Sequence, residues 1–256
     1  AILAITQGDK WGWSSFSLIF SFVLAGLLVT AFVIRSQRHS APLFDLALFR
    51  LKTFSVGMIG TVFFMVAFFS WLISLPTFIQ SVWGWSVLKT GFAIAPAPLL
   101  TAFVPPPAGR IAERIGNGPL LTTGGVFGAV GLSLHLIFTK IEPDYIKGIF
   151  IPGVLIGFAA GFGFAQLIGA AMRDVPRDKF GMAGAGRTTI FQLALALGVA
   201  LAFTIIGRPD NPQEALDGLQ ATWILGIACY ILQIFLFAFF GGPTKNNKTK
   251  SARLTT

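Results

Sequence analysis

The sequence predicts an all-α membrane protein with seven transmembrane helices. Of its 256 residues, 54% are hydrophobic and only 11% are charged, which is too little charge to cover a soluble domain of this size. The apolar residues also fall into blocks of roughly 20 residues, the length that a helix needs to cross the hydrocarbon core. The seven blocks are residues 13–34, 54–76, 88–108, 119–138, 148–170, 182–206 and 222–241.

The first block is followed by a polar connector, residues 35–52, which contains Pro42 and can include a short amphipathic helix. The other six blocks divide into two triplets, 54–138 and 148–241. Because three is an odd number, the triplets have opposite orientations in the membrane, as in transporters built from inverted repeats.

Prolines and glycines distinguish two of these blocks. The block 88–108 contains five prolines, and each removes a backbone donor and strains the preceding turn, so this helix should bend or end early. In the block 148–170, Gly153, Gly157 and Gly161 recur every four residues. They give this helix a smooth face that another helix backbone can approach closely.

The lysines and arginines indicate the orientation. When they are sorted by alternate loops, 14 of the 19 fall on one side. Short loops rich in these residues stay in the cytoplasm, so we expect the first residues outside and the C-terminus in the cytoplasm. The larger set is Arg35, Arg38, Arg50, Lys52, Arg110, Arg114, Arg173, Arg177, Lys179, Arg187, Lys245, Lys248, Lys250 and Arg253. The smaller set is Lys10, Lys89, Lys140, Lys147 and Arg208.

Composition argues against several functional classes. The single cysteine, Cys229, excludes a disulfide within the chain and argues against a metal site built on thiols. The net charge of +9 lies in short clusters between apolar blocks, which favours membrane anchoring over nucleic-acid binding. We recognise no nucleophile–base pair, phosphate-binding glycine loop or metal-ligand cluster. We therefore expect no enzyme, no metal and no cofactor.

The strongest local motif lies between the third and fourth blocks and contains Gly109, Arg110, Glu113, Arg114 and Gly116. A carboxylate near the start of the next helix is favoured by the helix N-terminus, and the arginines can pair with it. The motif resembles the loop signature of the major facilitator superfamily, which joins the second and third helices of each six-helix half. The resemblance implies that these five residues form a conformational latch in a cytoplasmic loop. The family usually has aspartate where this chain has Glu113.

Other segments resemble the fourteen-span drug:proton antiporter branch of that superfamily. The matching segments are Trp11 to Ser15, Pro42 to Arg50, Leu75 to Gln80, Gly91 with Pro96, Gly116 to Leu121, Phe180 with Gly181, and Gln192 to Ala200. The resemblance implies an external loop, linker helix and connector over 1–53. It further implies a C-terminal six-helix transporter bundle over 54–241, with the 3+3 inverted repeat, and a basic cytoplasmic tail over 242–256. The chain departs from the branch at Phe191, where arginine is common, and at Gln166, where proline is common.

Polar and aromatic residues inside the blocks are candidates for lining a cavity. By resemblance, the second and fifth blocks are central helices, so Trp71 and Gln166 rank first, with Phe68 on a similar face and Gln192 in the sixth block. Each glutamine can instead join two helices by hydrogen bonds, and each phenylalanine can instead face lipid. We expect His135 to be an interfacial histidine, with a titrating role as the alternative.

The resemblance implies an exporter of small hydrophobic or cationic compounds, driven by protons through alternating access and lying in the cell membrane as a multi-pass protein. The blocks contain no aspartate or glutamate. The start of the chain at Ala1 resembles the middle of a loop rather than a secretory signal, so we expect a missing N-terminal half that holds the proton-binding groups. The other expected partner is membrane lipid. Two alternatives stay open: an exporter of a metabolite or other small solute, and a seven-span receptor-type protein.

Overall fold

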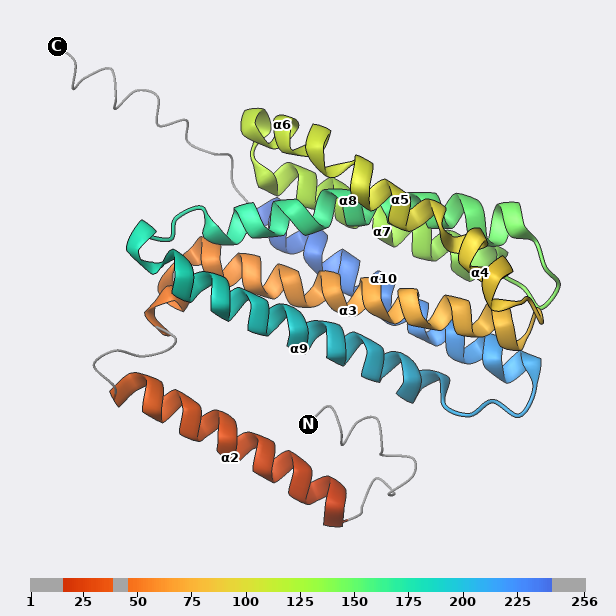
Figure 1. The fold of residues 1–256 in the computed structure, drawn as a ribbon, viewed down its shortest axis with the longest axis horizontal. Helices are drawn as coiled ribbons and strands as arrows, with labels where there is room; N and C mark the ends of the chain where they lie inside the picture. Colours follow the sequence, from red (N-terminus) through yellow and green to blue (C-terminus); the bar gives the residue numbers. More distant parts are fainter. Residues whose placement is uncertain (1–15, 39–45, 241–256) are drawn as a thin grey trace.

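The computed structural model describes residues 16–38 and 46–240, and all of its regular elements there are helical (Figure 1). The start of the first predicted span and the predicted tail, 242–256, lie outside these ranges. The elements are α2 (Phe16–Arg38), η1 (Leu46–Arg50), α3 (Lys52–Ser81), α4 (Val87–Ile94), α5 (Pro96–Phe103), α6 (Pro105–Ile115), α7 (Asn117–Phe138), η2 (Ile146–Phe150), α8 (Ile151–Met172), η3 (Arg177–Lys179), α9 (Phe180–Ile206) and α10 (Pro212–Phe240).

Within residues 16–38 and 46–240, five helical segments are long and apolar enough to cross a membrane. They are Lys52–Ser81, Asn117–Phe138, Ile146–Met172, Arg177–Ile206 and Pro212–Phe240. Each contains all or nearly all of one predicted block, so the expectation of a multi-pass α-helical membrane protein is confirmed. The number of seven spans stays a prediction. The 23-residue helix α2 covers the first block from Phe16 onward, and the proline-rich block is divided among α4, α5 and α6.

The division of the third block follows from its prolines. α5 begins at Pro96 and α6 at Pro105, and both junction residues, Ala95 and Val104, keep helical backbone angles. The backbone N–H of Leu99 still donates to the carbonyl of Ala95 at 3.1 Å, and that of Val104 donates to Leu100 at 2.9 Å. The three pieces therefore form one bent rod rather than three separate helices (Figure 1).

The last helix begins ten residues earlier than the predicted block, at Pro212 instead of residue 222. Asn211 and Glu214 explain this start. The backbone N–H of Glu214 donates to Asn211 Oδ1 at 2.9 Å, and the Glu214 carboxylate accepts from the backbone N–H of Asp210 at 3.0 Å. This reciprocal capping, with proline at the first helical position, starts the helix in the polar segment before the apolar block.

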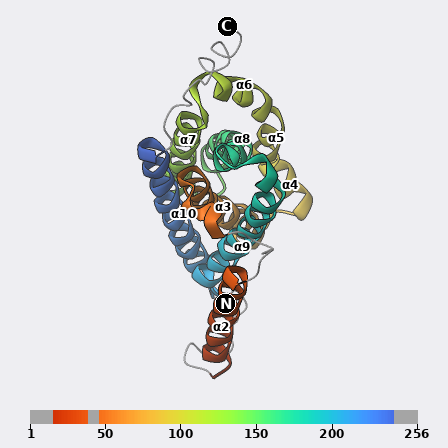
Figure 2. The same cartoon turned by 90° about the vertical axis from the view of Figure 1, so that its left-hand side faces the viewer.

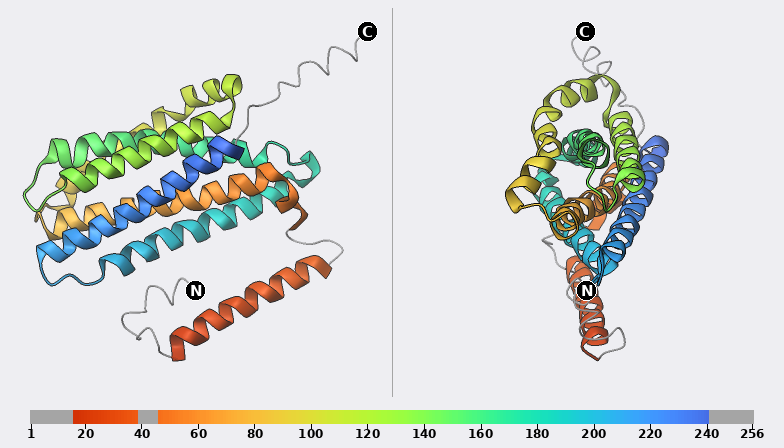
Figure 3. Two further views of the ribbon diagram at one scale, coloured as in Figure 1. Left: turned by 180° about the vertical axis from the view of Figure 1, so that it is seen from behind. Right: turned by 90° about the vertical axis from the view of Figure 1, so that its right-hand side faces the viewer.

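The helices pack around α8. Viewed from the end, α7, α6 and α5 form an arc around α8, while α3 contacts α8, α9 and α10 (Figure 2). α2 lies outside this bundle (Figures 1 and 3). Because α3, the rod α4–α6, α7, α8, α9 and α10 run in alternate directions, the charged residues gather at the two ends. We call one end the basic end; it includes Lys52, Arg110, Arg114, Arg173 and Arg177. The opposite end includes Lys89, Lys140, Lys147 and Arg208.

Small residues allow close helix contacts. A Cβ atom built on Gly57 of α3 would lie 2.6 Å from the Cβ of Ala171 on α8, and one on Gly157 of α8 would lie 2.9 Å from the carbonyl oxygen of Ala97 on α5. Gly161 is similarly close to Val104. The predicted smooth face of α8 is therefore used at two of its three glycines, because a Cβ on Gly153 would meet open space.

Replacing Gly57 with alanine should destabilise the bundle. The new methyl group would lie 2.7 Å from the Cα of Ala171, and because backbone atoms cannot rotate away, α3 and α8 must separate. We expect a loss of about 1–3 kcal/mol, measured as a lower thermal unfolding midpoint in detergent. Gly184→Ala on α9 is the matched control, since nothing lies within 4 Å of its added Cβ. Equal midpoints for the two variants would contradict the close α3–α8 contact.

Candidate functional site

A groove lies between α3, α8, α9 and the start of α6. Its volume is about 450 Å³, which falls in the range of small-molecule sites. It lies nearer the basic end, because Arg187 is the eighth residue of α9 and so about 10 Å along the helix from its start. The lining residues are Thr61, Met65, Pro105, Phe164, Ala165, Leu167, Ile168, Arg187, Thr188, Phe191 and Gln192.

Phe164 forms the aromatic wall of the groove and joins it to the interior. Its ring meets those of Phe64 and Phe68 edge to face, at centroid distances of 5.1 and 5.4 Å, and lies 6.5 Å from the ring of Phe191. Phe68 in turn lies 5.8 Å from Trp71. The aromatic rings thus form a continuous series from the groove to the interior of the opposite half of the bundle. Edge-to-face packing fixes the Phe164 ring and leaves part of it exposed to the groove.

Arg187 is the charged residue of the groove lining. It is half-buried, and it forms no ion pair with any carboxylate of residues 16–38 or 46–240. The charge pattern alone placed Arg187 with the loop cations. The structure instead places its side chain on the wall of the groove, one helical turn from Phe191 and beside Thr188. The signal in the sequence was its position inside the sixth apolar block.

The four predicted cavity residues lie in different places. Gln192 lines the groove, and Phe68 lies behind Phe164, 6% exposed. Gln166 is only 4% exposed and is absent from the groove lining, although the neighbouring Ala165 and Leu167 belong to it. Trp71 lies outside the groove. The lining also includes Phe164, Phe191 and Arg187. The sequence did not single out these three residues, because the pairing of helices about 100 residues apart decides which faces meet.

Trp71 takes part in a buried hydrogen-bond network. Its indole N–H donates to Nε2 of His135 at 3.0 Å, so the ring proton of a neutral His135 is on Nδ1, which lies 3.3 Å from the Thr139 hydroxyl. That hydroxyl donates to the carbonyl of Gly148 at 2.9 Å. The His135 ring also packs on Trp223, with centroids 4.9 Å apart. His135 is thus fully buried between helices near the end of α7 and joins α3, α7, η2 and α10, while its expected position at the membrane interface stays a prediction.

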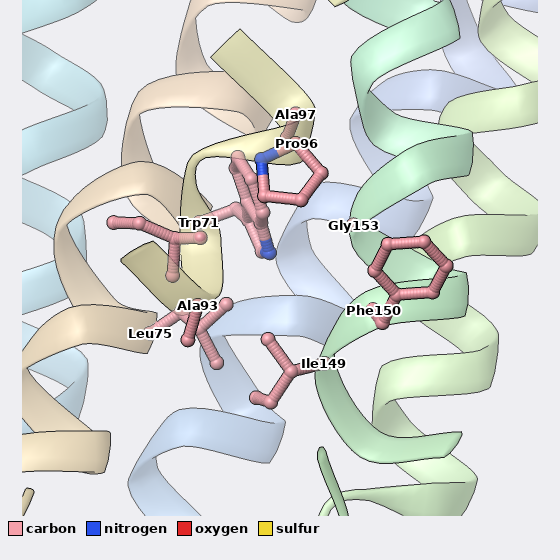
Figure 4. Close-up of a pocket in the computed structure, with 9 residues that line it drawn as sticks. Trp71, Leu75, Ala93, Pro96, Ala97, Ile149, Phe150 and Gly153 are labelled. Atoms are coloured by element: carbon pink, nitrogen blue, oxygen red, sulfur yellow. The ribbon is translucent and has the colours of Figure 1, made fainter. Parts of the chain in front are cut away.

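The other face of Trp71 borders a small pocket with Leu75, Ala93, Pro96 and Ile149 (Figure 4). The pocket has a volume of about 10 Å³, enough for roughly one water molecule. It cannot hold an organic solute in this conformation. The groove near the basic end is therefore the candidate small-molecule site.

The predicted latch motif forms the end of α6. Arg110, Glu113 and Arg114 are exposed, and Glu113 lies in the last turn of α6 rather than near the start of the next helix as expected. Among the described residues, its carboxylate forms no ion pair with either arginine. Gly116 has φ 90° and ψ 167°, a backbone conformation that requires glycine and turns the chain from α6 into α7. The structure gives Gly116 a clear role, while the latch itself stays a prediction.

The helices define a polytopic α-helical membrane protein with a groove of small-molecule size. The sequence matches the family described as Major Facilitator Superfamily over residues 1–199 and, in a second alignment, over 57–254. The chain belongs to this superfamily of transporters.

Curated relatives support this membership. The chain is 29% identical to "Multidrug resistance protein Stp" of Mycobacterium tuberculosis over 80% of its own length and 37% of the relative. It is 26% identical to "Lincomycin resistance protein LmrB" of Listeria monocytogenes, over 92% of the chain and 53% of the relative. It is 31% identical to "Uncharacterized transporter YebQ" of Escherichia coli, over 89% and 48%. The chain thus spans between 37% and 53% of the length of these three relatives.

Replacing His135 with leucine should destabilise the opposite end of the bundle. The indole N–H of Trp71 would lose its acceptor while staying 2% exposed, at a cost of about 1–3 kcal/mol. His135→Gln is the matched control, because its side-chain carbonyl can reach the position of Nε2 and accept the bond. The measurement is the thermal unfolding midpoint in detergent. A glutamine variant that is as unstable as the leucine variant would argue against the hydrogen bond as the cause.

Proposed function

We propose that this chain is the C-terminal part of a fourteen-span drug:proton antiporter that exports hydrophobic compounds, cationic ones included. The observation that carries the proposal is the groove of about 450 Å³ with its aromatic wall, in a chain of the superfamily whose relatives include named resistance proteins. A groove of this size, lined mainly by apolar residues, suits a solute of drug size better than a sugar or an ion.

Seven spans and alternating access belong to the same proposal. α2 would be the linker span, the bent rod α4–α6 would cross the membrane as one span, and α3 to α10 would form one half-bundle of two inverted triplets. This bundle would rock against an N-terminal half, with the substrate held between the two. The exposed groups of the α6 end, Arg110, Glu113 and Arg114, would bind that half or the α8–α9 loop in the alternative conformation. That half would also hold the proton-binding carboxylates.

Export can be tested with the full-length protein in bacteria that lack their own efflux pumps. We expect cells that express it to accumulate several-fold less of a fluorescent apolar dye than vector controls, and a protonophore to abolish the difference. Phe164→Ala should weaken export several-fold because it removes the aromatic wall. Phe235→Ala, at an exposed phenylalanine on the outside of α10, is the matched control and should change export less than about twofold at equal membrane levels. Export of a metabolite but of no dye would favour the exporter of a small natural solute.

The proposed orientation places the basic end in the cytoplasm of a cell-membrane protein. Single cysteines can replace Arg110 and Arg177 at the basic end, and Lys147 and Arg208 at the opposite end, in a background without Cys229. All four positions are exposed. We expect an impermeant maleimide to label only the two opposite-end cysteines in intact cells, because cations in short loops stay inside. Labelling of the Arg110 and Arg177 positions on different sides would rule out this topology.

A further inference from the structure

We propose that Arg187 is a substrate-binding residue and that the groove selects compounds carrying a carboxylate next to an aromatic or apolar body. This inference rests on the proposed transport function and narrows its substrate class. Among hydrophobic compounds it favours acids and zwitterions over purely cationic ones.

Charge complementarity is the first argument. The lining contains one guanidinium group and no carboxylate, so this wall of the groove presents a net positive charge. Arg187 is half-buried and forms no ion pair with a described carboxylate, so no described acidic side chain neutralises its charge. Asp174, at the end of α8, pairs with Arg173 at 3.6 Å. Within the described ranges no carboxylate pairs with this half-buried guanidinium, and its planar set of N–H donors is suited to bidentate binding of a carboxylate.

The arrangement of neighbouring groups is the second argument. Arg187 and Phe191 lie one helical turn apart on the same wall of α9, and Thr188 and Gln192 lie beside them. The exposed part of Phe164 faces the same groove from α8. An aromatic body resting on the two phenylalanines therefore places an attached carboxylate near the guanidinium, whereas the Thr188 hydroxyl donates to the Gly184 carbonyl at 3.0 Å. The side-chain amide of Gln192 adds a neutral donor.

Binding to the purified full-length protein tests this directly. The probes are a rhodamine with a free carboxylate and the methyl ester of the same rhodamine, followed by fluorescence polarisation in neutral detergent. The two dyes share their ring system and differ in one negative charge. We expect the acid to bind about tenfold more tightly than the ester, as for one charge-assisted hydrogen-bonded pair.

Variants of Arg187 identify the cause of the preference. Arg187→Gln should abolish it by weakening acid binding alone, and Arg187→Lys should keep part of it, because the charge remains without the planar fork. Arg177→Gln is the matched control, an exposed arginine of the same end that does not line the groove, and it should leave the preference unchanged.

The outcomes separate this inference from the proposed function. Equal affinity for acid and ester, unchanged in Arg187→Gln, would overturn the inference and leave Arg187 as a contact for lipid phosphate. An equal loss of both dyes in Arg187→Gln would overturn it as well, since that result indicates a structural role. A preference for the acid that depends on Arg187, in a protein that exports neither dye from cells, would support the inference while the proposed export fails.

Discussion

The structure depends on the close approach of α8 to its neighbours. No water reaches the backbone inside a bilayer, so helices satisfy their own polar groups and associate mainly through side-chain packing. Here glycines provide the space. Gly157 and Gly161 of α8 receive α5, and Gly163 receives the ring of Phe64 from α3, which a Cβ would approach to 2.3 Å. Gly128 of α7 receives the ring of Tyr230 from α10 in the same way. Large aromatic side chains therefore fill the spaces that glycines leave, and this pairing sets which helices are neighbours.

Polar contacts between elements are distributed unevenly over this packed frame. At the opposite end, Trp71, His135 and Thr139 join three elements, and the indole N–H of Trp83 donates to the carbonyl of Lys140 at 2.8 Å. Around the groove, the contacts that we find between α3, α8 and α9 are mainly apolar and aromatic. Hydrogen bonds are directional, whereas apolar contacts tolerate sliding. In the half of the bundle nearer the basic end, the Gln233 amide also donates to the Leu121 carbonyl at 3.1 Å and joins α10 to α7, but neither residue lines the groove. The helices around the groove are therefore held together mainly by apolar contacts.

The aromatic series connects these two ends. Phe164 at the groove touches Phe68, and Phe68 touches Trp71, whose position is fixed by its bond to His135. A displacement of the Phe164 ring therefore requires the buried rings of Phe64 and Phe68 to move as well. Phe68 and Trp71 lie outside the groove lining, but ring contacts connect both residues to it through Phe164.

The sequence was sufficient for the features that depend on one helix at a time. Block length predicted the apolar helices, and the prolines at 96 and 105 predicted the bend of the third, because both effects act on the local backbone. The sequence also contains a signal for the early start of α10, because Asn211 and Glu214 form a capping pair. Hydropathy alone does not detect this pair. The groove could not be predicted from the sequence of any single helix. It needs the faces of α3, α8 and α9 that carry Thr61, Phe164 and Arg187 to converge, and no periodicity within a single helix specifies which of its faces meets a helix 100 residues away. For the same reason, the charge pattern groups Arg187 with the loop cations, whereas the packed helices place it in the groove lining.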